Sequence, residues 1–173
     1  MLSALLAVVL SQPMPMGLPG PDAASGKALA PTALETARIY FIAGNLPAAR
    51  EWGQRGLKRE ARVCKPLLKD LAEYSYLVSK YEPLTLEEAR TLLALDKRIS
   101  PKAVGKLTEP VVDRYVKGPL ARASLWAEQG AAAEAVRFVD DVLLVDPANA
   151  EARALRLRLL EVADGGAPFD GGR

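Results

Sequence analysis

Residues 120–147 read LARASLWAEQGAAAEAVRFVDDVLLVDP, and their apolar residues recur at helical spacing on both sides of Gly130. Glycine ends a helix readily, because it adopts backbone conformations that other residues avoid. The small residues Ala123 and Ala135 stand where two helices would cross closely, and Trp126 would fill the space beside them. We therefore predict an antiparallel helical hairpin that turns at Gly130.

An upstream segment repeats this spacing. Four of its residues keep the offsets of the small, aromatic, glycine and small residues downstream: Ala37, Tyr40, Gly44 and Ala49. The copy then departs from the pattern, since Gly53 and Gly56 occupy the positions of two downstream valines. We expect a second hairpin here, whose second helix is either loosely packed or long.

The two segments resemble the tetratricopeptide repeat, in which small, aromatic, glycine, small and proline positions recur. Pro147 supplies the closing proline of the downstream unit. The resemblance covers residues 118–147 well and 33–52 in part. It implies antiparallel helical hairpins stacked as a short solenoid. A non-repetitive helical bundle with one accidental match is the alternative.

Composition also favours an all-α fold of about seven to eight helices. The chain has 173 residues, of which 29 are Ala and 27 are Leu, and both residue types lose little freedom in a helix. The expected helices are 32–43, 46–59, 63–81, 86–95, 101–116, 119–129, 132–145 and 148–162.

Three local signals support these boundaries. Thr85 and Glu88 form a capping-box pattern, and Ser100-Pro101 has the pattern of a helix start. A seam of apolar residues in steps of three and four predicts one buried helix face: Cys64, Leu67, Leu71, Tyr74, Val78 and Tyr81.

The ends of the chain are expected to lie outside this helical domain, which spans 32–163. Residues 1–11 have the apolar run of a secretory signal, although no Lys or Arg precedes it. A mis-assigned start, or an apolar segment that packs on the domain, is the alternative. Residues 12–31 are rich in Pro and Gly and predict a flexible linker. Residues 164–173 predict a disordered tail.

The absence of histidine from the chain argues against most catalytic chemistry. No imidazole base or histidine metal ligand is possible. The single cysteine, Cys64, precludes an intramolecular disulfide and a cysteine-rich metal site. No glycine-rich loop follows a strand pattern, so nucleotide binding has no support. We expect no enzymatic activity, no cofactor and no metal ion.

Cys64 has two interpretations. Lys65 and Arg62 would lower the pKa of an exposed thiol and make it reactive. Cys64 also begins the apolar seam, and this position favours a buried core cysteine.

Basic residues concentrate in residues 46–69, where seven basic and two acidic side chains give a net charge of +5. Six of them form a basic stripe: Arg55, Lys58, Arg59, Arg62, Lys65 and Lys69. The stripe could dock an acidic partner, peptidoglycan or nucleic acid. Alternatively, adjacent helices pair their charges. Nucleic acid is not expected, because only Trp52 interleaves with these cations.

The repeat resemblance also implies partner-binding positions on the first helix of each hairpin. Carried over residue by residue, these are Arg38, Phe41 and Ile42 upstream, and Ser124, Ala127 and Glu128 downstream. The resemblance implies that they line a groove for a peptide segment or a partner helix.

A second resemblance covers the middle of the chain. ALDKRISP at 94–101, Lys106, the Trp126 unit and DPANAEA at 146–152 look like the helical tails of certain bacterial signalling and secretion-system proteins. That likeness suggests a non-enzymatic adaptor or scaffold in a cell-envelope, secretion or pilus-type assembly. We expect a periplasmic or exported protein without a transmembrane helix. A cytosolic structural subunit of a larger complex is the alternative.

Overall fold

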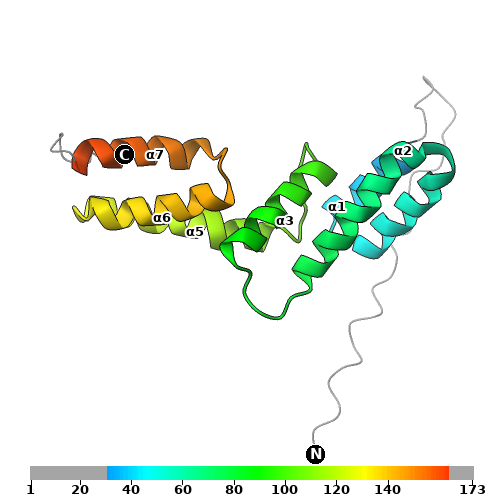
Figure 1. Cartoon of the computed structure of the whole chain (residues 1–173), viewed down its shortest axis with the longest axis horizontal. Helices are drawn as coiled ribbons and strands as arrows, with labels where there is room; N and C mark the ends of the chain where they lie inside the picture. Colours follow the sequence, from blue (N-terminus) through cyan, green and yellow to red (C-terminus); the bar gives the residue numbers. More distant parts are fainter. Residues whose placement is uncertain (1–30, 164–173) are drawn as a thin grey trace, which may run out of the picture. The chain divides into compact units, whose positions relative to one another are not determined.

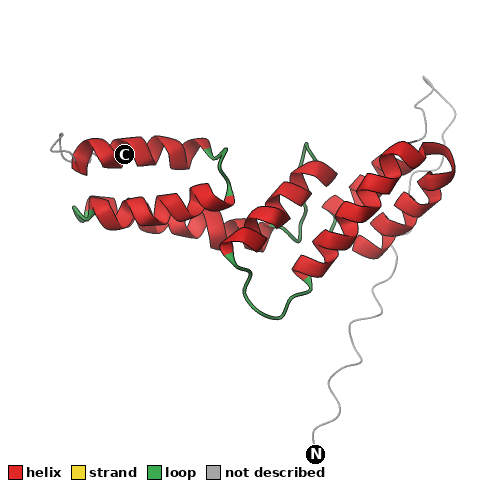
Figure 2. Ribbon diagram, viewed as in Figure 1, coloured by secondary structure: helices red, strands yellow, loops and turns green. Residues whose placement is uncertain are grey.

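A computed structural model describes residues 31–163, and every regular element in that range is helical (Figures 1 and 2). The all-α prediction is thereby confirmed for this part of the chain. The predicted leader 1–11, the linker 12–31 except Pro31, and the tail 164–173 lie outside the described residues. The elements are α1 (Ala33–Ile42), α2 (Leu46–Val78), α3 (Leu86–Ile99), α4 (Glu109–Val112), the π-helical η1 (Asp113–Lys117), α5 (Gly118–Glu128), α6 (Ala132–Val145) and α7 (Ala150–Ala163).

Two hairpin turns have the same backbone conformation. Gly44 ends α1 with φ of +80° and Gly130 ends α5 with φ of +79°. At the first turn the Gly44 N–H donates to the Phe41 carbonyl and the Asn45 N–H to the Tyr40 carbonyl. The second turn repeats both hydrogen bonds, from Gly130 to Ala127 and from Ala131 to Trp126. Both turns are therefore Schellman motifs, and each lies at the glycine where a hairpin turn was predicted.

Small residues let the helices of each hairpin approach closely. Ala37 and Ala49 have no exposed surface in the first hairpin, and Ala123 and Ala135 have none in the second. Each pair is separated by the same number of residues as the other. The two hairpins are thus built alike at the turn and at the helix crossing.

Helix α2 folds back on itself at Glu60, whose φ of −126° and ψ of 35° break the helix. The N-terminal arm, 46–59, and the C-terminal arm, 61–78, lie side by side (Figure 1). A Cβ atom at Gly56 would stand 2.5 Å from Cys64 Sγ, and one at Gly53 would stand 2.9 Å from Leu68 Cδ2. Of the two expectations for this helix, loosely packed or long, loose packing is wrong, because these glycines allow a close approach between the two arms.

The apolar seam is buried in its first four residues: Cys64, Leu67, Leu71 and Tyr74. It then continues through Leu77, because α2 ends at Val78 and not at residue 81. Tyr81 is fully exposed in the connection to α3, so its predicted burial was wrong.

No helix starts at Pro101. Ser100 instead closes α3 by donating its N–H to the Asp96 carbonyl oxygen, and residues 101–108 form turns. These turns are held by the buried Asp96 carboxylate, which accepts hydrogen bonds from the Gly105 N–H and the Thr108 hydroxyl. The local Ser-Pro signal is overridden by this tertiary contact.

Residues 109–128 form one continuous helical run in which η1 joins α4 to α5. Pro119 has no N–H, and its ring would crowd the carbonyl four residues earlier in a regular α-helix. The wider π turn, in which the Gly118 N–H bonds the Asp113 carbonyl, accommodates the proline. The predicted boundary between 101–116 and 119–129 is therefore absent, and Pro110 stands in the first turn of α4 instead of kinking a helix.

Two apolar clusters form the core, and α3 contributes to both. The first packs α1, α2 and α3 around Phe41 and Tyr74, whose rings meet edge to face at 4.8 Å. The second packs α3, η1, α5, α6 and α7 around residues such as Val139. Leu84 and Val111 are half-buried and contact both clusters.

Candidate functional site

The first set of predicted partner-binding residues lies mainly in the core. Phe41 is only 1% exposed, and the loop at Gly105 closes over its ring. Arg38 is half-buried and donates its Nε–H to the Ile99 carbonyl at 2.9 Å. Ile42 is half-buried against the same cluster. The prediction of an exposed patch here was wrong, because α2, α3 and the 101–108 turns cover this side of α1.

The second set is divided between surface and core. Glu128 is exposed and Ser124 is half-buried, whereas Ala127 is only 3% exposed. Trp126 is 39% exposed and therefore does not fill the interior as expected. The indole is too exposed to act as the core filler that the repeat pattern implies at this position.

Two aliphatic side chains are exposed at one shared position of the hairpins. Ile39 in α1 is 58% exposed and Leu125 in α5 is 53% exposed. Each stands two residues after the buried alanine of its hairpin. Sequence reasoning missed them, although the available signal was an apolar residue at the same offset in both copies. Exposed aliphatic side chains at a repeated position are suited to contact with a partner protein.

The basic stripe is exposed throughout, and most of its charges are not paired within residues 31–163. Arg55 bonds Glu51 at 2.6 Å and lies over the Trp52 ring. Among the residues that the structure describes, no acidic side chain forms an ion pair with the other five: Lys58, Arg59, Arg62, Lys65 and Lys69.

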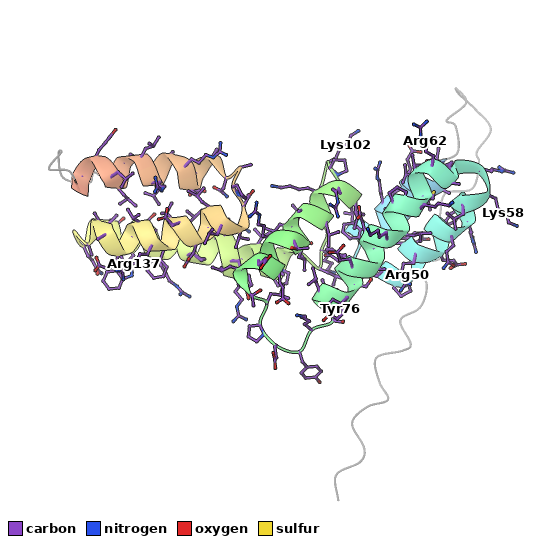
Figure 3. The ribbon with its side chains drawn as sticks, viewed as in Figure 1. Arg50, Lys58, Arg62, Tyr76, Lys102 and Arg137 are labelled. Carbon is purple, nitrogen blue, oxygen red and sulfur yellow. The ribbon has the colours of Figure 1, made fainter. Side chains whose placement is uncertain are left out.

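Charge pairing between neighbouring helices does occur outside the stripe. Arg98 of α3 bonds Asp70 of α2, and Lys97 of α3 bonds Asp146 after α6. The stripe itself does not take part, so pairing among adjacent helices does not explain it. Two of its residues, Lys58 and Arg62, project in different directions near the Glu60 turn of α2, so the stripe does not follow one line (Figure 3).

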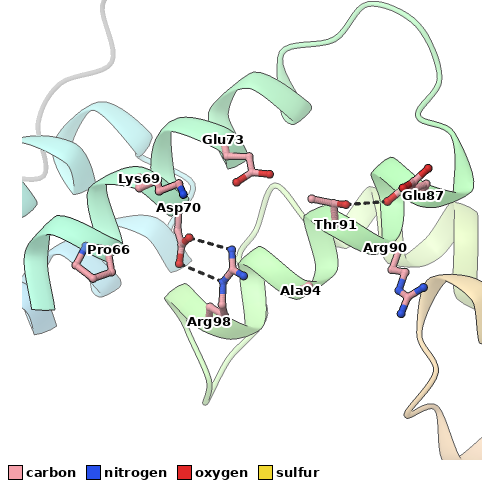
Figure 4. A pocket seen from close by; sticks show the side chains of 9 residues that line it. All are labelled: Pro66, Lys69, Asp70, Glu73, Glu87, Arg90, Thr91, Ala94 and Arg98. Atoms are coloured by element: carbon pink, nitrogen blue, oxygen red, sulfur yellow. Dashed lines mark hydrogen bonds and ion pairs between the residues drawn. The ribbon is translucent and has the colours of Figure 1, made fainter.

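A groove runs between the C-terminal arm of α2 and α3. It has a volume of about 650 Å³, and it is lined on the α2 side by Pro66, Lys69, Asp70 and Glu73 (Figure 4). A smaller hollow of about 250 Å³ adjoins it and is lined by Arg62 and Val63 among others. The two hollows share Pro66, Asp70 and Arg98, so they adjoin at the Arg98–Asp70 pair.

The Arg98–Asp70 pair joins the two walls of this groove. Arg98 donates from Nη2 to Asp70 Oδ1 at 2.9 Å and from Nε to Oδ2 at 3.2 Å. Two parallel hydrogen bonds to one carboxylate give the pair a defined geometry. The pair therefore fixes the separation of α2 and α3 along the groove.

A buried polar network lies behind the groove. Asp96 Oδ1 accepts from the Thr108 hydroxyl at 2.6 Å, and that hydroxyl also bonds the Tyr74 hydroxyl at 2.7 Å. Burial raises the pKa of Asp96, and burial raises the pKa of Tyr74 to about 12. Sequence analysis did not single out this network, because its members are far apart in the chain.

Cys64 is completely buried, which confirms the structural interpretation of this residue. Burial, with a smaller contribution from the nearby Glu60 carboxylate, raises the pKa of the thiol. The thiolate needed for nucleophilic or redox chemistry is therefore disfavoured.

Two acidic side chains that each stand next to a second carboxylate in the sequence, Glu88 and Asp140, have structural partners. Glu88 completes the capping box with Thr85 and forms an ion pair with Lys80, and Asp140 bonds Arg156 at 2.7 Å. In residues 31–163 no acidic or cysteine side chains gather in a set that could hold a metal ion. None of the helices described is both long and apolar enough to cross a bilayer.

Comparisons with known proteins do not assign this chain to a family. No family model, curated protein or solved structure matches it.

Proposed function

We propose that this protein is a non-enzymatic, protein-binding adaptor built from tetratricopeptide-like hairpins. It would bind a peptide segment or a partner helix within a bacterial cell-envelope, secretion or pilus-type assembly. The repeat architecture is part of the proposal: the two hairpins would represent units of a divergent short solenoid, with the C-terminal arm of α2, α3 and the 101–117 segment between them.

The observation that carries the proposal is the likeness of the two hairpins. Gly44 and Gly130 close identical Schellman turns, and Ile39 and Leu125 are exposed at the same position. Helical hairpins that bury small residues and leave aliphatic ones in solvent are suited to contact with other macromolecules. Individual exposed side chains are common, but their repetition at one position favours a shared role.

A cytosolic structural subunit of a larger complex is the second candidate. The exposed apolar residues of α6 and α7 favour it, since Leu144 is 55% exposed and Leu157 is 63% exposed. Helix α7 (Ala150–Ala163) is the last helix within residues 31–163, and a neighbouring subunit that covers Leu157 would account for the exposure of this side chain.

Crosslinking in the native host, followed by affinity capture and mass spectrometry, tests the adaptor role. We expect the wild-type chain to capture a reproducible partner set, and the Ile39→Glu/Leu125→Glu variant to lose at least one member. Leu157→Glu is the control, because it also replaces an exposed aliphatic side chain by a carboxylate, but outside the two hairpin positions.

A wild-type chain that captures no partner would contradict the adaptor role. If Leu157→Glu causes the partner loss and the double variant does not, the subunit interpretation gains support instead. Amino-terminal sequencing of the protein from its host separates export from a cytosolic location. A start at or near Gln12 is expected for an exported protein.

A further inference from the structure

The charge distribution along the α2–α3 groove identifies the kind of segment that would bind there. Arg62 lines the smaller hollow and Lys69 the larger one, and they project from the same arm of α2 seven residues apart. A spacing of seven residues places two side chains on one helix face. Both side chains are exposed and form no ion pair within the described residues.

The charge of the lining residues changes along the α2–α3 groove. Its centre holds the Arg98–Asp70 pair, which is internally neutralised. Beyond that pair the larger hollow holds Glu73, Glu87 and Arg90, and Lys69 lies beside the pair (Figure 4). The charge of the groove is therefore mixed at the Glu87 end and positive at the Arg62 end, where Arg38 also lines the smaller hollow.

We propose that the α2–α3 groove binds an acidic segment of a partner protein through its side-chain carboxylates, with Arg62 and Lys69 as the principal contacts. This proposal rests on the adaptor role above and extends it to a specific site and ligand chemistry. Arg62 and Lys69 can bind a carboxylate without first breaking an ion pair within the described residues. Exposed cations of this kind speed association with an acidic partner and favour it over other partners.

The same surface is poorly suited to other anionic partners. Glu73 and Glu87 would repel a continuous phosphate backbone, and no aromatic ring lines the groove to stack on a base. An anionic membrane is also a poor fit, since Val63 is the one large apolar lining residue of the two hollows that is exposed. A polypeptide can place its carboxylates selectively against Arg62 and Lys69.

Fluorescence anisotropy with a labelled deca-glutamate peptide tests the proposal on the full-length chain. The carboxyl terminus of the probe is amidated, so that only side-chain carboxylates are available. We expect saturable binding at about 50 mM salt and weaker binding at about 300 mM, because salt screens exposed charges. The Arg62→Glu/Lys69→Glu variant should weaken binding about tenfold, as expected for the loss of two exposed charge contacts.

The matched control is Lys58→Glu/Arg59→Glu, which changes the net charge equally but lies outside both hollows. We expect it to weaken binding less than about twofold at the higher salt, where long-range charge effects are small. Far-ultraviolet circular dichroism should show unchanged helix content in both variants. An equal loss of binding in the two double variants would overturn the groove as the site.

Two further probes test the ligand class. A deoxythymidine oligonucleotide of the same length and phosphatidylglycerol vesicles should bind less tightly than the peptide. Tighter binding of either probe, or no peptide binding at low salt, overturns the proposal. If the chain captures protein partners through Ile39 and Leu125 but does not bind the peptide, the groove is not a binding site for an acidic segment, and the adaptor role stands. Failure of both experiments overturns the adaptor role as well.

Discussion

At the scale of the residue, glycine is required at two positions for two different reasons. Gly130 needs its backbone freedom, because its φ is +79° although the space that a Cβ atom would occupy there is open. Gly56 needs its small size, because it meets Cys64 across the α2 hairpin and Ala33 of α1. The same residue type therefore has a conformational role in one turn and a steric role in one helix contact.

We expect Gly130→Val to lower the free energy of unfolding by more than about 1 kcal/mol, because β-branched residues strongly disfavour positive φ. Gly130→Asn should cost less, since asparagine adopts this conformation more readily. Chemical denaturation followed by circular dichroism measures both values. Equal stability of the wild type and the valine variant would contradict the hairpin assignment.

Gly56→Ala should destabilise the fold by about 1–3 kcal/mol through overpacking against Cys64 Sγ. This loss exceeds the gain in helix propensity from alanine. In a double-mutant cycle, Cys64→Ala removes the closest atom and should recover part of the loss caused by Gly56→Ala. Strictly additive free energies in this cycle would show that the two residues do not interact.

At the scale of the element, a polar network joins the 101–108 turns to α2 and α3. Asp96 is the centre of this network and is almost fully buried. Its carboxylate oxygen satisfies two donors, while its burial disfavours the ionised form and raises its pKa. The hydrogen bonds of Asp96 hold the 101–108 turns in place. Above its pKa, however, the buried Asp96 carboxylate carries an unfavourable negative charge.

The sign of the resulting pH dependence follows from the raised pKa of Asp96. When the pH rises from the unfolded value of 3.8 toward the folded value, the unfolded chain releases this proton first. Stability contributed by this group is complete below that range and is lost as the pH rises through the folded pKa. Asp96→Asn keeps the acceptor oxygen and removes the titration.

We therefore predict that the stability difference between Asp96→Asn and the wild type shifts in favour of the variant as the pH rises above about 4. Asp96→Leu should lose about 2–3 kcal/mol at neutral pH, because it leaves the Gly105 N–H and the Thr108 hydroxyl unpaired. Denaturant unfolding at several pH values measures both effects. A pH-independent difference would contradict a raised pKa for Asp96.

At the scale of the described part of the molecule, two apolar clusters are joined through α3 and through two half-buried side chains. Leu84 and Val111 contact both clusters, whereas the neighbouring Val112 contacts only the cluster around α5, α6 and α7. Because helical arrays derive stability from neighbouring units, the contacts between the clusters determine how cooperatively they unfold.

The two tryptophans allow this coupling to be measured. Trp52 packs against the first cluster, and Trp126 belongs to α5 in the other half. In Trp52→Phe and Trp126→Phe backgrounds, the remaining indole should report coincident unfolding. Adding Leu84→Ala and Val111→Ala should separate the two apparent stabilities by about 1 kcal/mol. The control replaces Val111→Ala by Val112→Ala. If the control separates the two apparent stabilities equally, Val111 does not couple the two clusters.

The chain's own sequence determined the helical class, the two glycine turns, the buried alanines and the burial of Cys64. These features depend on local backbone preference and on the periodicity of apolar residues, which neighbouring residues alone can specify. The Thr85–Glu88 capping box was correctly predicted for the same reason.

Only the tertiary structure decided which surfaces remain in solvent. Phe41 became a core residue because α2, α3 and the 101–108 turns cover it, while Trp126 remained partly exposed. No helix begins at Ser100-Pro101, because the Gly105 N–H and the Thr108 hydroxyl donate hydrogen bonds to Asp96 and hold the segment in turns. The α2–α3 groove likewise joins residues about 30 positions apart, whose proximity depends on how helices pack and not on any local preference.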